Sequence, residues 1–187
     1  DTYIQLDAVT RRNLEIDLTL RGDPTPTLFS LLDTTCTAMG ARCLRHWLHH
    51  PLRDQSLAAT RHSAIGELQE RGLFNELRKT LRSIGDIERI TARVALKTAR
   101  PRDLSGLRES LLQLPLLRAG LQAVQTGKLQ ALTAALQAPV GALDLLQCAI
   151  RDEPAAVLRE GGVIADGYDA ALDELRALQT NCGEFLL

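Results

Sequence analysis

The side chains best suited to metal chemistry lie in one short segment, 31–52, which holds three of the four histidines and two of the four cysteines. The segment is predicted to form a helix that begins after Thr37, a suitable N-cap, and is ended by a proline. At about 100° per residue, Cys43, His46 and His50 fall within about 60° of arc on that helix. This spacing could present three ligands to one metal ion.

Packing is the alternative role for the same segment, and the surrounding residues favour it. Trp47 falls in the same sector, where a bulky ring would disturb a tetrahedral zinc shell, and no carboxylate stands at HExxH spacing. A structural zinc site also needs a fourth ligand, for which no partner cluster exists elsewhere. We therefore expect no metal, with Leu44, Trp47 and Leu48 packed inward.

Patterns that bind nucleotides or provide a nucleophile are also missing from the sequence. It contains no GxxxxGK[ST] phosphate loop and no GxSxG elbow. The glycine-rich stretch GGVIADG at 161–167 lacks the GxGxxG spacing, and we expect a turn or a short strand there. The chain by itself is expected to be non-enzymatic and to hold no cofactor.

The most specific polar feature is a run of basic residues, Arg89, Arg93, Lys97 and Arg100, spaced four, four and three residues apart. On one helical face they could contact phosphates or another domain. The simpler interpretation is a solvated face, or a set of ion pairs to a neighbouring acidic helix.

Composition limits the class of protein. The 187 residues are 45% hydrophobic, 24% charged and only 3% aromatic, which favours helices, and the net charge of −1 provides no general attraction to nucleic acid or membrane. The four cysteines form no CxxC pair and indicate thiols in a reducing cytosol. With no apolar run of membrane length and no secretory leader, we expect a cytoplasmic protein, and the start at Asp1 suggests a piece of a longer one.

The hydrophobic period is helical almost throughout, so an all-α, multi-helix core is predicted, with at most one or two very short β segments. Helices are expected over 57–68, where Arg61 interrupts the apolar stripe, over 74–84, from Asp86 to Val94, and from Pro101 until Pro115 ends or kinks the helix. Shorter ones are expected within 116–124, 129–136 and 140–150, and a last one from Asp169. Only 13–18, with alternating apolar residues, and 161–167 are expected to be non-helical.

The last helix carries an apolar stripe up to the end of the chain. It consists of Leu172, Leu175, Leu178, Cys182 and Phe185. Without a partner for this stripe, we expect either fraying after about Leu178 or a contact between two molecules.

Four segments carry a resemblance to a known family. They are DAVTRRNLEI at Asp7–Ile16, SLLDTTCTAMGARCLRHWLHHPLRD at Ser30–Asp54, LKTARPRDLSGLRESL at Leu96–Leu111, and REGGVIADGYDAALDELR at Arg159–Arg176. In this order and with these gaps they resemble successive motifs of bacterial MutS, the DNA mismatch-recognition ATPase, over nearly the whole chain.

The resemblance implies the first part of the MutS core, or lever, domain over 1–187, truncated before the DNA-gripping clamp. Residues 1–18 would be the segment by which the chain enters the core, and 168–187 the base of a long lever helix. The domain would relay movement between the clamp and the ATPase domain. The parent protein would bind mismatched duplex DNA, ATP and Mg²⁺, and would form a homodimer.

The family's functional residues do not transfer to this chain. No Phe-x-Glu motif stands in the family's context, since Phe29 precedes Ser30 and Leu31, and Phe74 starts a helical run. Two alternatives therefore stay open: a free-standing helical interaction module, and a small helical metalloprotein built around the histidine segment.

Overall fold

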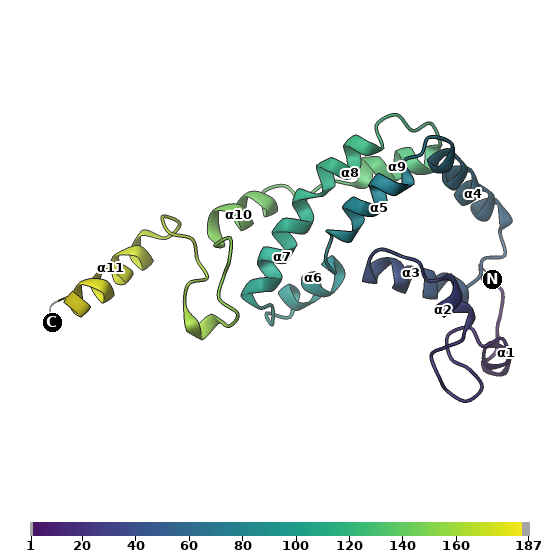
Figure 1. The fold of residues 1–187 in the computed structure, drawn as a ribbon, viewed down its shortest axis with the longest axis horizontal. Helices are drawn as coiled ribbons and strands as arrows, with labels where there is room; N and C mark the ends of the chain where they lie inside the picture. Colours follow the sequence, from purple (N-terminus) through teal and green to yellow (C-terminus); the bar gives the residue numbers. More distant parts are fainter. Residues whose placement is uncertain (1, 185–187) are drawn as a thin grey trace. The chain divides into compact units, whose positions relative to one another are not determined.

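The computed structural model describes residues 2–184 of the chain, with side chains through residue 179. In chain order the helices are α1 (Ala8–Asn13), α2 (Leu28–Leu32), α3 (Ala38–His49), α4 (Gln55–Glu70), α5 (Phe74–Arg82), α6 (Ile87–Ala95), α7 (Pro101–Leu112), α8 (Leu114–Gly120), α9 (Gly127–Ala135), α10 (Ala142–Ala149) and α11 (Ala170–Glu184), with a 3-10 turn η1 at Leu158–Glu160 (Figure 1). The described residues contain no named strand, only two isolated β-bridges, Tyr3 with Leu52 and Ile150 with Ile164. The all-α prediction is confirmed.

The chain divides into two compact units. The first comprises Asp1–Ile87 and Gln113–Gln137, and the second comprises Glu88–Leu112 and Ala138–Leu187. Each unit is therefore built from two separate stretches of sequence, and long-range contacts must hold its two stretches together. Across the described residues, no helix combines the length and the apolar character that a bilayer span needs.

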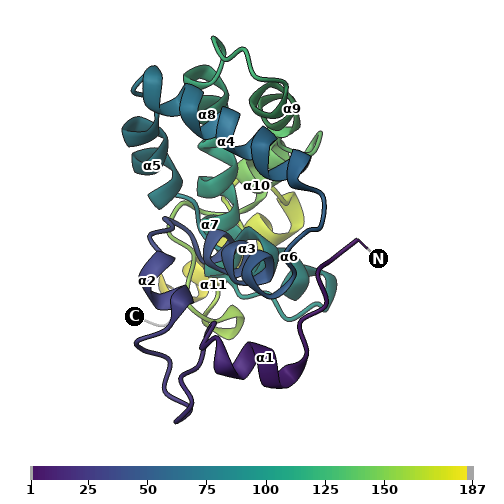
Figure 2. The same ribbon diagram turned by 90° about the vertical axis from the view of Figure 1, so that its right-hand side faces the viewer.

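The core of the first unit lies among α4, α5, α8 and α9, which gather in Figure 2. Ala64 of α4 packs with Leu121, Val124 and Leu129, all buried. Four half-buried leucines surround them: Leu68 of α4, Leu73 and Leu77 at the start and middle of α5, and Leu136 at the end of α9. Small and branched aliphatic side chains thus provide the packing in a chain with few aromatic residues.

Local signals set the ends of the helices as the sequence predicts. The hydroxyl of Thr37 accepts the backbone N–H of Gly40 at 3.0 Å and caps α3. Asp54 caps α4 in the same way through Ser56. Pro115 lies in the first turn of α8, where its missing N–H leaves no hydrogen bond unmade. The predicted break at this proline is therefore confirmed.

The alternating residues in 13–18 do not form a strand. Asn13 ends α1, and the backbone carbonyls of Glu15 and Ile16 accept N–H groups from the start of α2 instead of a strand partner. Ile16 is buried, whereas Leu14 and the other alternating leucine are exposed. The alternation thus reflects one buried side chain in a bend and not a sheet face.

The segment 161–167 forms the turn and short β contact that were predicted. Ile164 pairs with Ile150 in an antiparallel bridge, framed by a hydrogen bond from Arg151 N to Val163 O at 3.0 Å and one from Ala165 N to Ala149 O at 2.9 Å. The end of α10 is therefore joined to the segment that leads into α11.

Helix α11 begins at Ala170, one residue after the predicted start, and its exposed face includes Leu175 and Leu178. The rest of the predicted stripe, Cys182 and Phe185, lies outside the described side chains. Fraying of this end or pairing between molecules stays a prediction.

A carboxylate latch joins α4 to the start of α9. Glu67 accepts the backbone N–H groups of Gln125 at 2.6 Å and Thr126 at 2.8 Å, as well as the Thr126 hydroxyl. Arg71 lies 3.0 Å from the same carboxylate. The side chain of Thr126, the N-cap residue of α9, makes no capping hydrogen bond. Glu67 of α4 instead accepts the backbone N–H of this residue from another helix. The hydrogen bonds from Thr126, ahead of the charge of Arg71, lower the pKa of Glu67 to about 2.

The pH dependence of unfolding should identify this latch. The pKa of Glu67 is about 2 in the folded chain against an ordinary value of 4.5, so its stabilising effect is complete above the ordinary value and is lost as the pH falls through about 2. Glu67→Gln should lower the urea midpoint at neutral pH and flatten its decline between about pH 5 and pH 2. Glu70→Gln, at an exposed position of the same helix, should retain the wild-type slope; equal slopes in all three proteins would contradict the latch.

Candidate functional site

A cluster of two arginines and two aspartates holds the base of α11. Asp166 accepts hydrogen bonds from Arg151 at 2.5 Å and from Arg176 at 2.8 Å. Arg176 also bonds Asp173 at 3.0 Å and the carbonyl of Ile164 at 2.9 Å. One guanidinium of α11 therefore reaches both the bridge segment and its own first turn.

The glycines of this segment explain how the chain turns into α11. Gly162 and Gly167 have φ of 63° and 83°, in the left-handed region where a side chain is strained. The N–H of Gly167 donates to Asp173 at 2.7 Å, and Asp169 accepts the N–H of Leu172 at 3.1 Å. The helix start is thus fixed by its own acidic residues.

The side chain of Arg108 connects α7 to the end of α10 and so to this cluster. Its side chain is buried, with 4% exposure, and it donates to the carbonyl oxygens of Ile150 at 2.8 Å, Arg151 at 3.4 Å and Asp152 at 3.3 Å. Ile150 is also the residue that pairs with Ile164. A continuous chain of polar contacts therefore runs from α7 through the end of α10 to α11.

None of these arginines was identified from the sequence. Arg108 offered one signal, since it lies between Leu107 and Leu111, which are spaced four residues apart as on one apolar face of the helix. A charged residue inside an apolar stripe is seldom buried unless it is paired. Its acceptors are 42 to 44 residues further along the chain, so no local pattern could name them.

The predicted basic run does not form a single helical face. α6 ends at Ala95, and Lys97 has a left-handed φ of 56°, so Lys97 and Arg100 lie beyond the helix. Arg93 instead pairs with Asp103 in the first turn of α7, through two hydrogen bonds of 2.9 and 2.6 Å. The hydrogen bond from Arg93 lowers the pKa of that carboxyl.

The ion-pair interpretation is thus confirmed for Arg93. Asp103 also accepts the backbone N–H of Arg100 at 2.9 Å, which fixes the turn between α6 and α7. The side chains of Arg89, Lys97 and Arg100 are exposed. Their contact with phosphates or another domain stays a prediction.

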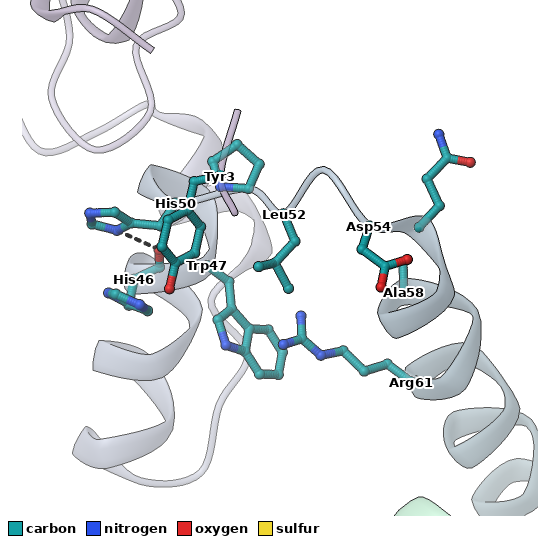
Figure 3. A pocket seen from close by; sticks show the side chains of 10 residues that line it. Tyr3, His46, Trp47, His50, Leu52, Asp54, Ala58 and Arg61 are labelled. Carbon is teal, nitrogen blue, oxygen red and sulfur yellow. Dashed lines mark hydrogen bonds between the residues drawn. The ribbon is translucent and has the colours of Figure 1, made fainter. Parts of the chain in front are cut away.

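The histidine segment does not pack as predicted. Trp47 is 44% exposed, and the guanidinium of Arg61 lies over its ring, 3.6 Å from the centroid (Figure 3). Leu44 and Leu48 are half-buried. The prediction that Trp47 packs inward is wrong. Arg61, which interrupts the apolar stripe of α4, stacks on the indole, and in the described part of the chain no buried apolar side chains enclose it.

The histidines of this segment contact one another. The rings of His46 and His50 stack with centroids 4.4 Å apart, and Nδ1 of His50 donates to the carbonyl of His46 at 3.1 Å. Cys43 is exposed. Among the side chains that the structure describes, residues 2–179, no three of His, Cys, Asp or Glu are placed to share a metal ion.

A hollow of about 310 Å³ lies beside these rings and is drawn in Figure 3. Its walls include Tyr3, whose ring meets that of His50 edge-on at 5.7 Å, and the Trp47–Arg61 pair. Asp54 also lines it while capping α4. The mixture of one carboxylate, one guanidinium, two imidazoles and two aromatic rings selects no particular ligand.

Comparison with known families gives a match over almost the whole chain. The sequence model of the family described as MutS domain III matches residues 9–186. The match covers the described helices except the first residue of α1, and it includes the arginine cluster at the base of α11.

Removing the buried guanidinium should destabilise the second unit. Arg108→Ala leaves backbone carbonyls without donors, at a cost of about 1 to 3 kcal/mol for each buried acceptor left unsatisfied. We expect a loss of at least about 2 kcal/mol in the free energy of unfolding, measured by urea titration. Arg102→Ala, at an exposed position of the same helix, should change it by less than about 0.5 kcal/mol. Similar losses for both variants would refute a special role for Arg108.

A double-mutant cycle should isolate the contact between Trp47 and Arg61. An exposed cation–π pair is worth about 0.5 to 1 kcal/mol, so Trp47→Ala and Arg61→Ala should be non-additive by about that amount. Trp47→Ala alone should cost less than the roughly 3 to 5 kcal/mol typical of a buried aromatic ring. Strict additivity in urea unfolding would show that the two side chains do not interact in solution.

Proposed function

We propose that this chain, which belongs to the MutS domain III family, is a mechanical relay in a mismatch-recognition protein of DNA mismatch repair. In this proposal it joins a DNA-gripping clamp to an ATPase domain of the same cytoplasmic protein. Mismatched duplex DNA, ATP and Mg²⁺ bind to the other domains of a homodimeric parent. The chain itself contributes stiffness and fixed connections.

The arginine cluster is the observation that carries the proposal. α11 has 15 residues and so extends about 22 Å at about 1.5 Å per residue. Its second turn is tied to Asp166 and to the carbonyl of Ile164 through Arg176. A displacement of the helix must therefore move these groups or break charge-assisted hydrogen bonds.

The contacts of Arg108 support transmission beyond α11. The bridge between Ile164 and Ile150 and the hydrogen bond from Arg108 to the carbonyl of Ile150 lead from the base of α11 to α7. Packed and hydrogen-bonded elements with alternative arrangements can couple distant sites. If DNA and ATP favour different positions of α11, their binding free energies become coupled, and the coupling is reciprocal.

The exposed basic residues fit the same proposal. We infer that Arg89, Lys97 and Arg100 contact either another domain of the parent or DNA phosphates. A phosphate contact would make Lys97→Gln weaken duplex binding by the parent and reduce its salt dependence. A domain contact would leave the salt dependence unchanged and alter stability instead.

Breaking the cluster should uncouple ATP from DNA in the parent protein. Asp166→Asn removes the charge shared by Arg151 and Arg176, so the ratio of affinities for mismatched duplex with and without ATP should move toward one. Allosteric coupling is typically about 5- to 150-fold, which makes even a partial loss measurable by fluorescence anisotropy. The affinity for DNA without ATP should change little.

Reciprocity provides a second readout of the same variant. The effect of DNA on ATP affinity must fall by the same factor as the effect of ATP on DNA affinity. Asp144→Asn, which removes an exposed charge from α10, is the matched control and should retain wild-type coupling. Unchanged coupling in Asp166→Asn, with faster amide exchange at the base of α11, would show that the cluster is structural but not a relay.

A further inference from the structure

The surface between α4 and α9 contains an apolar groove that the relay does not use. We call it the α4–α9 groove; its volume is about 430 Å³. Three large apolar side chains form its walls: Trp47, Ile65 and Leu132, which are 44%, 51% and 48% exposed. Ala64 and Leu129 lie at its floor and are buried.

The packing of the first unit does not explain these walls. The buried cluster of Ala64, Leu121, Val124 and Leu129 is complete beneath them. Single exposed aliphatic residues are ordinary on protein surfaces, but several gathered in one hollow mark an interaction site. Leaving them in water forgoes about 25 cal/mol per Å² of apolar area, which a partner could recover.

The charged side chains that line the groove, Arg61 and Lys128, are both cationic. His62 also lines it, and no acidic residue does. The two acidic residues of α4, Glu67 and Glu70, line a different hollow with Arg71 and Gln125. A groove with this charge, on a chain whose net charge is −1, selects an acidic partner and disfavours a basic one.

The walls of the groove indicate the shape of that partner. From Ala58 to Leu68 the lining follows α4 for about 15 Å, or nearly three helical turns at about 1.5 Å per residue. Both walls are helices, whose backbone groups bond internally, so the groove offers no strand edge to an extended peptide. A helix brings its own backbone hydrogen bonds and presents side chains at i, i+4 and i+7 to such a groove.

We propose that the α4–α9 groove binds an acidic amphipathic helix of a separate protein. The apolar face of that helix packs on Ile65 and Leu132, beside Trp47, and its flanking carboxylates meet Lys128 and His62. The source is a separate protein because charges of one sign beside half-exposed apolar walls suit a reversible, electrostatically steered encounter. Permanent interfaces are more apolar and exclude charges from their centre.

A pair of designed peptides tests the proposal on the 187-residue chain. The first is a 15-residue helical peptide with leucines at positions 4, 8 and 11 and glutamates flanking them. The second has lysine at each glutamate position. In NMR titrations of the labelled chain, the acidic peptide should shift resonances of α4 and α9 and bind at least about tenfold more tightly than the basic one, with affinity falling as salt is added.

Variants of the groove separate its apolar and charged contributions. Ile65→Ser and Leu132→Ser should each weaken acidic-peptide binding about tenfold or more. The double variant His62→Glu, Lys128→Glu should reverse the preference to the basic peptide, which a merely unfolded protein would not do. Leu145→Ser, at an exposed position of α10, is the matched control and should bind as the wild type does.

Several results would overturn the proposal. Equal binding of both peptides would reduce the groove to a non-specific apolar patch, and shifts outside α4 and α9 would place the site elsewhere. Concentration-dependent dimerisation that Ile65→Ser abolishes would assign the groove to a second copy of the chain. Stronger amide protection of α4 and α9 in the complete parent protein than in the 187-residue chain, with no partner present, would assign the groove to another domain. None of these outcomes bears on the coupling measured with Asp166→Asn.

Discussion

The buried guanidinium of Arg108 is the contact on which the second unit depends. This unit combines two stretches of chain, and Arg108 on the first stretch bonds the carbonyl oxygens at the end of α10 on the second. A guanidinium has several donors in a fixed plane, so one side chain can satisfy successive carbonyls that no helix or strand satisfies. Because an unpaired buried charge is costly, the same group also disfavours other ways of joining these stretches.

Similar polar contacts recur wherever distant parts of this chain meet. In the first unit Glu67 accepts two backbone N–H groups ahead of α9, and Arg42 holds Asp86 through two hydrogen bonds of 2.7 Å. Among the side chains that the structure describes, the buried aliphatic core is small and includes no aromatic ring. A small aliphatic core can repack in several ways. Directional, charge-assisted hydrogen bonds of this kind fix how the distant segments are placed against one another.

The two functional proposals draw on different surfaces. The proposed relay rests on Arg176, Asp166 and Arg108, whose hydrogen bonds lead from α11 through the end of α10 to α7. The docking proposal rests on apolar side chains and basic groups of the first unit, which the relay leaves unused. One domain can serve in both ways, since stiffness and an exposed binding surface require no reactive group.

The sequence by itself determined the helices and the family. Helical periodicity, the Thr37 cap and Pro115 act over one or two turns, so a local pattern is enough to place them. The tertiary structure decided which polar groups pair. Arg61 covers Trp47 from another helix, and Arg108 finds acceptors more than 40 residues away. Such pairings depend on how helices approach one another in space, which the period of a single helix does not specify.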